Sequence, residues 1–172
     1  MTHPLDSYIR NIPDFPIPGI QFKDITTLLR DGQALRTAID AFVARYRNQR
    51  IDAVVAIESR GFIFGAPLAY ALGIGMVPVR KKGKLPADTY SVEYALEYGS
   101  AILEIHKDAL PNNARVVVID DLLATGGTIA AACQLVEMAG GQVVETAFLI
   151  ELSMLDGRQK LQNYPIFSQI TY

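Results

Sequence analysis

The sequence predicts an α/β fold with a mostly parallel sheet. Two observations predict it: short apolar runs typical of buried strands, and segments with helical spacing of apolar residues that alternate with those runs. Strands that alternate with helices form parallel sheets joined by right-handed crossovers. The chain of 172 residues, of which 50% are hydrophobic and 20% charged, is long enough for one domain with a sizeable core, and we expect a single domain over residues 1–172.

The first part of the chain contains one strand and two helices in this interpretation. Residues 11–19 are rich in proline and predict an extended, irregular arm. A helix then follows from about Asp31, which can cap it, and its apolar stripe consists of Leu35, Ala38, Ile39, Phe42 and Tyr46. A buried strand is predicted over residues 53–57, and a crossover helix over 62–72, where Pro67 is expected to bend or end it.

The rest of the chain continues the alternation of strands and helices. Strands are predicted over residues 76–79, 115–120 and 143–150, and Gly140-Gly141 ends a helix whose inward stripe includes Ile129, Ala132, Cys133 and Val136. Between residues 81 and 107 the pattern changes. There we expect two antiparallel strands, 91–94 and 101–106, that leave the core sheet, and a mobile loop over about 81–90.

Composition narrows the classes of protein. A net charge of −2 argues against a dedicated nucleic-acid binder, and the lone Cys133 excludes a disulfide framework or a cysteine-rich zinc site. Residues 1–10 lack the apolar core of a signal peptide, and no apolar stretch is long enough to span a bilayer. We therefore expect a soluble, cytoplasmic protein that binds neither nucleic acid nor membrane; the two isolated histidines do not predict a metal site.

The most informative segment joins an apolar strand to two carboxylates and a small turn. Asp120 and Asp121 end the run, a turn with two glycines follows, and a helix begins near Thr128. Backbone amides of such a turn and the helix dipole favour an anion, and ligands of open α/β sheets bind at the carboxyl ends of strands. The segment therefore predicts a phosphate site beside two acids that can hold ribose hydroxyls. The alternative is a plain connection with solvated aspartates; the spacing fits neither a Walker loop nor a dinucleotide fingerprint.

Two further groups of residues favour a second anion at the same edge. Ser59 and Arg60 directly follow the buried strand at 53–57, and an Arg there can clamp an anion with paired donors. The basic run Arg80, Lys81, Lys82 and Lys84 opens a loop and can fold over a pyrophosphate. The alternatives are a surface ion pair for Arg60 and a solvated basic face for the run.

Five ordered motifs resemble those of type I phosphoribosyltransferases, and the similarity extends from Asp14 to about Leu161. The motifs are Asp120 to Thr128, Phe15 to Gly19, Glu58 to Phe62, Arg80 to Pro86 and Leu96 to Gly99. The resemblance implies a five-stranded parallel core, a small N-terminal hood over about residues 1–30 and a flexible lid loop over about 81–99. It also implies a cis peptide between Glu58 and Ser59, where some relatives have Asp in place of Glu58.

The same resemblance implies an activity: transfer of the 5-phosphoribosyl group from phosphoribosyl pyrophosphate to adenine, giving AMP and pyrophosphate. Glu97 would be catalytic, exchanging a proton with the base. The implied substrate-binding residues are Asp120, Asp121, Ala124, Thr125, Gly126, Gly127 and Thr128 for ribose 5-phosphate, Ser59, Arg60, Arg80, Lys84 and Tyr98 for pyrophosphate and the lid, and Gln21, Phe22, Lys23 and Leu122 for adenine.

The resemblance further implies Mg²⁺ bound through phosphoribosyl pyrophosphate, with no direct metal ligand from the protein, and a homodimer. Two alternatives stay open. One is a phosphoribosyltransferase for another base, such as hypoxanthine, guanine, xanthine or orotate. The other is a non-catalytic, nucleotide-sensing regulator on the same fold.

Overall fold

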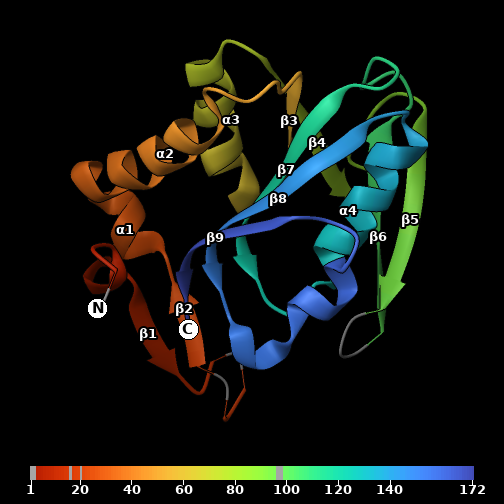
Figure 1. Cartoon of the computed structure of the whole chain (residues 1–172). Helices are drawn as coiled ribbons and strands as arrows, with labels where there is room; N and C mark the ends of the chain where they lie inside the picture. The colour runs from red at the N-terminus through yellow and green to blue at the C-terminus, as the bar shows by residue number, and fades with distance from the viewer. Residues whose placement is uncertain (1–2, 16, 20, 96–98) are drawn as a thin grey trace.

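A seven-stranded sheet forms the centre of the computed structural model, which describes residues 3–15, 17–19, 21–95 and 99–172 (Figure 1). The strand order is β5-β6-β4-β3-β7-β8-β9. The strands are β3 (Ala53–Ile57), β4 (Gly75–Lys81), β5 (Thr89–Ala95), β6 (Ser100–His106), β7 (Arg115–Leu123), β8 (Gln142–Glu151) and β9 (Ile166–Thr171). The five strands from β4 to β9 in this order run parallel, which agrees with the expected core.

Helices cover both faces of the sheet (Figure 1). The helices α1 (Thr26–Arg30), α2 (Gly32–Tyr46) and α3 (Arg60–Leu72) pack on one face, and α4 (Gly127–Met138) packs on the other. Side chains of β3 and β7 alternate between the two cores: Val54 and Val117 belong to the first, Val55 and Val118 to the second. Strands buried on both faces explain the continuous apolar runs in the sequence.

Several predicted elements are confirmed. The strand at 53–57 is β3, and α2 begins after Asp31, whose carboxylate accepts hydrogen bonds from the backbone N–H groups of Gln33 (3.0 Å) and Ala34 (2.8 Å). The crossover helix α3 begins two residues earlier than predicted, at Arg60. Pro67 lies inside α3 and does not end it.

Other boundaries were wrong in a way that matters for the site. The strand predicted over 115–120 continues as β7 to Leu123, so Asp121 also lies within the strand and not beyond its end. The strands predicted over 76–79 and 143–150 are also longer, and β9 was not predicted at all. Polar residues near strand ends hid these extensions, because the apolar pattern stops before the backbone pairing does.

The antiparallel strands predicted between residues 81 and 107 are confirmed as β5 and β6, but their predicted departure from the core sheet is wrong. β6 pairs with the end of β4, with Arg80 opposite Glu104, and so extends the main sheet. Of the stretch expected to form a lid, residues 82–88 connect β4 to β5 and residues 89–95 are strand β5. The mobility of this stretch stays a prediction.

The N-terminal segment is more regular than expected. β1 (Arg10–Pro13) pairs antiparallel with β2 (Gln21–Asp24), so the prediction of an irregular arm from residue 11 was wrong for its first residues. A short 3-10 helix, η1 (Asp6–Tyr8), precedes the hairpin.

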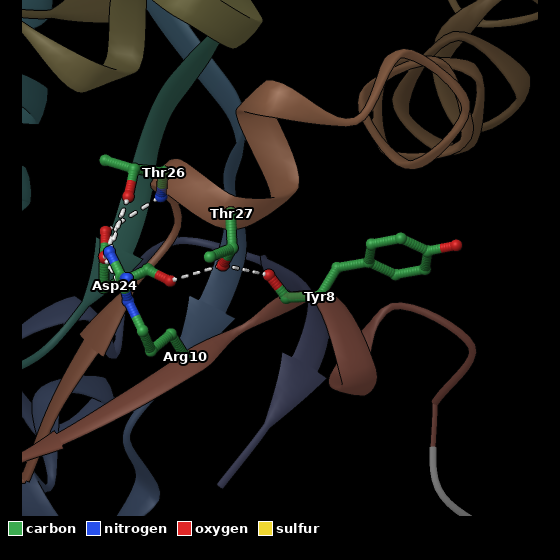
Figure 2. A network of polar contacts seen from close by, with 5 residues as sticks. All are labelled: Tyr8, Arg10, Asp24, Thr26 and Thr27. Carbon is green, nitrogen blue, oxygen red and sulfur yellow. Dashed lines mark hydrogen bonds and ion pairs between the residues drawn. The ribbon is translucent and has the colours of Figure 1, made fainter.

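A polar network fastens this hairpin to α1 (Figure 2). Asp24 accepts hydrogen bonds from Arg10 Nε (3.0 Å), from the backbone N–H of Thr26 (2.9 Å) and from its hydroxyl (2.8 Å). The Thr27 hydroxyl donates to the carbonyl of Tyr8 (2.6 Å). The Thr26 and Arg10 hydrogen bonds lower the pKa of Asp24 to about 2.

The chain reaches β9 through two more 3-10 helices, η2 (Ser153–Leu155) and η3 (Gly157–Leu161). Its end comes back to the N-terminal region, where the Tyr172 hydroxyl lies 3.1 Å from Asp6 Oδ1. Within the described ranges, no helix combines the length and the apolar character needed to cross a bilayer.

Candidate active site

Two neighbouring parallel strands, β3 and β7, bring the acidic and phosphate-turn residues to one edge of the sheet. Both strands end in polar residues, Glu58 and Ser59 after β3, and Asp120 and Asp121 near the end of β7. The helices that follow begin at this same edge. Parallel strands that are adjacent present their carboxyl ends side by side, which is where open α/β sheets hold ligands.

Close packing at this edge depends on Gly61, near the start of α3. A Cβ there would lie 2.8 Å from the carbonyl oxygen of Ile119 and 3.1 Å from Asp120 Oδ1. Any side chain at position 61 would therefore push α3 away from β7. The peptide bond between Glu58 and Ser59 is cis, as the resemblance implied.

The two aspartates have different surroundings. Asp121 is 5% exposed, and its Oδ2 pairs with Arg60 Nε at 2.6 Å. Asp120 accepts a hydrogen bond from the backbone N–H of Asp121 at 2.9 Å. Burial, and then the neighbouring carboxylate of Asp121, raises the pKa of Asp120 well above its usual value. Burial likewise raises the pKa of Asp121, although Arg60 opposes this. Both acids are thus held where a cationic group or hydroxyl donors would be favourable.

A cation cluster, Arg80 and Lys84, gathers around Glu58. Arg80 donates from Nε (3.0 Å) and Nη2 (2.9 Å) to Glu58 Oε2, and Lys84 Nζ lies 3.6 Å from the same oxygen. The backbone N–H of Lys81 donates to Glu58 Oε1 at 2.6 Å. Burial raises the pKa of Glu58, but these donors outweigh it and the net pKa is lowered. Arg80 and Lys84 are therefore paired with Glu58 at the sheet edge, while Lys81, Lys82 and Lys84 stay exposed to solvent.

Two adjoining cavities lie at the sheet edge and share Arg60, Asp120 and Asp121. The first has a volume of about 320 Å³ and is lined by Glu58, Ser59, Arg60, Lys81, Lys84, Asp120 and Asp121. The second, of about 180 Å³, is lined by Arg60 and by residues 120–129, which include all residues predicted for the phosphate turn. The structure thus places a cation-lined hollow next to a turn of backbone amides.

The turn itself has the geometry expected for close approach to an anion. Gly126 has φ of 80°, a left-handed conformation that favours glycine, and it immediately precedes the first turn of α4. The Thr128 hydroxyl lies 3.4 Å from the Tyr94 hydroxyl of β5. Free N–H groups at the start of a helix favour a phosphate.

The residues predicted for the base are only partly at this place. Leu122 lines the second cavity, whereas Gln21, Phe22 and Lys23 on β2 line neither of the two cavities formed by the described residues. Phe22 packs edge-to-face on Phe15, with ring centroids 5.1 Å apart, and Lys23 Nζ lies 3.5 Å from the ring centroid of Tyr172. Glu97 and Tyr98, predicted for catalysis and the lid, lie outside the described residues.

Two residues of the site were missed by the sequence-based predictions. Glu58 was noted only as part of a motif, although it holds the cation cluster. Glu104 on β6 is 6% exposed and accepts from the backbone N–H of Gly83 at 2.9 Å and from the Ser91 hydroxyl at 3.2 Å. A Glu among apolar residues in a predicted strand was the available signal for Glu104.

Comparison with known proteins agrees with this arrangement. The protein-family model described as the phosphoribosyl transferase domain matches residues 25–169 of this chain. An adenine phosphoribosyltransferase of Chloroflexus aurantiacus is 69% identical over 168 residues, which cover 98% of this chain and 97% of that protein. Such a match covers the sheet and both cavities.

Solved structures agree as well. The crystal structure of adenine phosphoribosyltransferase from Thermoanaerobacter pseudethanolicus has a TM-score of 0.93 at 56% identity and covers 98% of each chain. The Saccharomyces cerevisiae enzyme, solved with adenine and an imino-altritol bisphosphate, has a TM-score of 0.91 at 43% identity and covers 96% of each chain.

Fold, cavities and similarity together define the class. The chain belongs to the phosphoribosyl transferase family and, within that family, to the adenine phosphoribosyltransferases.

Proposed function

We propose that this chain transfers the 5-phosphoribosyl group from phosphoribosyl pyrophosphate to adenine, forming AMP and pyrophosphate in purine salvage. The observation that carries this function is the pair of adjoining cavities that share Asp120 and Asp121. A substrate with a phosphate at one end and a pyrophosphate at the other fits a turn of amides joined to a cation-lined hollow. The relatives from Chloroflexus aurantiacus and Roseiflexus sp. are both named adenine phosphoribosyltransferase, which supports this activity.

The 5′-phosphate would occupy the turn from Ala124 to Thr128. Backbone N–H groups and the positive end of the α4 dipole favour it there, and the hydroxyls of Thr125 and Thr128 can add donors. Asp120 and Asp121 would accept hydrogen bonds from the ribose hydroxyls. In their ionised form these carboxylates would also favour the positive charge that develops on the sugar as the leaving group departs.

The pyrophosphate would lie in the first cavity. Ser59, Arg60, Arg80 and Lys84 can donate to its oxygens and stabilise the charge that builds up when the bond from the anomeric carbon to the pyrophosphate oxygen breaks. The new bond forms between that carbon and a nitrogen of the imidazole ring of adenine, and Glu97 would take the proton that this nitrogen loses. Tyr98 and the lid would then exclude water.

Adenine would lie between Phe22 and Leu122, with the backbone of Gln21 and Lys23 at its edge. Leu122 already lines the cavity of the phosphate turn, so the base would be adjacent to the ribose. The hood over about residues 1–30 would close the other side.

Mg²⁺ fits this site as an ion carried by the substrate. Mg²⁺ prefers oxygen ligands and retains water, so phosphate oxygens of the substrate and water would hold it, with no direct ligand from the protein. When bound, the ion offsets charge on the leaving pyrophosphate. We further propose a homodimer in the cytoplasm, as the family resemblance implies; light scattering after size exclusion measures the oligomeric state.

The test is a base-by-base assay of pyrophosphate release with the purified chain. We expect turnover with adenine, and much less with hypoxanthine, guanine, xanthine or orotate. The variant Glu97→Gln should still bind AMP but turn over at least about 100-fold more slowly, as general acid–base catalysis typically contributes 10²–10⁴.

The matched control is Glu93→Gln, which changes a carboxylate on β5 that accepts a hydrogen bond from the Ser100 hydroxyl. This variant should keep most of the rate. The proposal fails if adenine is not a substrate, or if both variants have the same turnover.

A further inference from the structure

Glu58 has no role in the proposed reaction, although it lies at the centre of the predicted pyrophosphate site. We propose that Glu58 is a positioning residue that holds Arg80 and Lys84 in the orientation that receives pyrophosphate. This inference rests on the proposed function and adds to it a residue that acts through other residues.

Both carboxylate oxygens of Glu58 are occupied by donors from one segment of chain. Oε2 accepts hydrogen bonds from Nε and Nη2 of Arg80 and forms an ion pair with Lys84 Nζ. Oε1 accepts a hydrogen bond from the backbone N–H of Lys81. The side chain of Glu58 is only 7% exposed, whereas those of Arg80 and Lys84 are 34% and 51% exposed. A buried anion thus fixes two cations that stay partly exposed, and one of them, Lys84, lines the first cavity.

The segment is closed by further contacts. Arg80 Nη1 donates to the carbonyl of Lys84 at 3.2 Å, and the backbone N–H of Gly83 donates to Glu104. These bonds fold the turn after β4 back toward the sheet. Two carboxylates therefore contact this segment: Glu58, just after β3, contacts the charged groups, and Glu104, within β6, contacts the backbone of Gly83.

Both cations keep donors for a substrate. A guanidinium has five N–H groups and an ammonium has three. The contacts with Glu58 and with the carbonyl of Lys84 therefore leave further N–H donors on both Arg80 and Lys84. Lys84 and Lys81 line the first cavity together with Glu58. The remaining donors of Lys84 are available to a pyrophosphate in that cavity, and Arg80 contacts two residues that line it, Glu58 and Lys84.

A carboxylate in an anion site also repels the anion, and the two effects must be weighed. Glu58 with Arg80 and Lys84 keeps a net charge of +1, and the carboxylate lies behind the cations, which are more exposed. Without Glu58, the two positive side chains of Arg80 and Lys84 would repel each other and turn toward solvent, at a cost in side-chain entropy when substrate binds. Orientation therefore outweighs repulsion.

The experiment compares Glu58→Gln with Glu58→Asp in the full chain. We expect Glu58→Gln to raise the KM for phosphoribosyl pyrophosphate and the inhibition constant of pyrophosphate about tenfold, while the Kd of AMP and the KM for adenine stay within about twofold. AMP has no pyrophosphate, so its binding reports on the rest of the site. Glu58→Asp keeps the charge and should recover most of the pyrophosphate affinity.

Glu145→Gln is the matched control. Glu145 is also a buried carboxylate paired with an arginine, Arg45, but it lies outside both cavities. Its loss should lower the Tm without separating pyrophosphate binding from AMP binding.

Three results would overturn the inference: unchanged or tighter pyrophosphate binding by Glu58→Gln, an equal loss of AMP and pyrophosphate binding, or an Asp variant as weak as the Gln variant. Failure of the proposed function is a different result, because the unsubstituted chain would then make no AMP from adenine.

Discussion

Gly126 lies directly against the backbone of Gly157. A Cβ added to Gly126 would overlap the carbonyl oxygen of Gly157, and one added to Gly157 would overlap the carbonyl oxygen of Ala124 and come within 2.9 Å of Leu123 Cδ1. The phosphate turn is therefore supported from behind by the start of η3, with two backbones in contact and no side chain between them.

The first prediction follows from this contact. Gly157→Ala should displace the turn that we propose binds the 5′-phosphate, because the overlap is with backbone that cannot rotate away. Overpacking of this kind typically costs about 1–3 kcal/mol. The Kd of AMP, measured by calorimetry, should rise about 5-fold or more.

Gly32→Ala is the control for this prediction, since a Cβ on Gly32, in the first turn of α2, meets nothing within 4 Å. Its AMP affinity and Tm should be unchanged or slightly improved. Equal AMP affinity of Gly157→Ala and the unsubstituted chain would show that the turn does not depend on η3.

The second prediction concerns the pH dependence of stability at Asp120. Burial and Asp121 raise the pKa of Asp120 in the folded state, so between the unfolded and the folded pKa the folded chain keeps a proton that the unfolded chain has released. Stability from this group is fully present below about pH 4, the pKa of an unfolded Asp, and is lost as pH rises through the folded pKa. Asp120→Asn removes that loss.

Asp120→Asn should therefore raise the Tm at pH 7 by about 2–4 °C, which corresponds to roughly 1 kcal/mol for a chain of this size, and abolish most of the activity. The gain should shrink as the pH falls from the folded pKa toward about 4, and it should be absent below that. Thermal unfolding of both proteins between pH 3 and pH 8 measures this. A Tm difference that does not vary with pH would show that Asp120 does not titrate differently in the folded chain.

The third prediction concerns the N-terminal hairpin. Asp24 is fastened to Arg10 and Thr26, and its lowered pKa of about 2 means that its ionised form stabilises the fold above about pH 4, with the contribution lost as pH falls toward 2. Solvent screens the ion pair between Asp24 and Arg10, because the Arg10 side chain is 57% exposed. We therefore expect Asp24→Asn to lower the free energy of unfolding by only about 1 kcal/mol at pH 7.

Because Asp24 ends β2, on which Phe22 and Lys23 lie, Asp24→Asn should also raise the KM for adenine several-fold and leave the inhibition constant of pyrophosphate unchanged. Asp40→Asn, on the exposed face of α2, is the matched control and should change neither. A hairpin without a role in base binding would give the same adenine KM in all three proteins.

Much of the fold could be predicted because apolar residues decide which strands are buried. The runs at 53–57 and 115–120 are buried on both faces, and alternation of strands and helices then leaves few topologies. What could not be predicted are elements fixed by backbone pairing at polar positions. Leu122 and Leu123 pair with β8 beyond Asp120 and Asp121, although these two carboxylates interrupt the apolar pattern of the strand.

The candidate site divides in the same way. The phosphate turn was predictable because its function needs backbone amides and small residues that are adjacent in sequence. The role of Glu58 was not, since the partners Arg80 and Lys84 follow it by 22 and more residues and meet it only through the pairing of β3 with β4. The support of Gly126 by Gly157 was hidden for the same reason.

The last prediction concerns the hydroxyl pair of Tyr94 and Thr128. β5 packs on the start of α4, and the two hydroxyls lie 3.4 Å apart. If the Thr128 hydroxyl binds the phosphate of the nucleotide, Tyr94 acts on the nucleotide only by fixing that hydroxyl. Removing either hydroxyl should then weaken AMP binding, and the two losses should not add.

A double-mutant cycle measures this. Thr128→Val should raise the Kd of AMP about 5–10-fold, and Tyr94→Phe about 2–3-fold, which is the range expected for loss of one net hydrogen bond. The double variant should bind AMP as weakly as Thr128→Val alone. The exposed Tyr70, changed to Phe, serves as the control and should leave the Kd unchanged. Additive losses in the double variant would mean that Tyr94 contributes independently of Thr128, and that β5 supports the nucleotide by packing and not through this pair of hydroxyls.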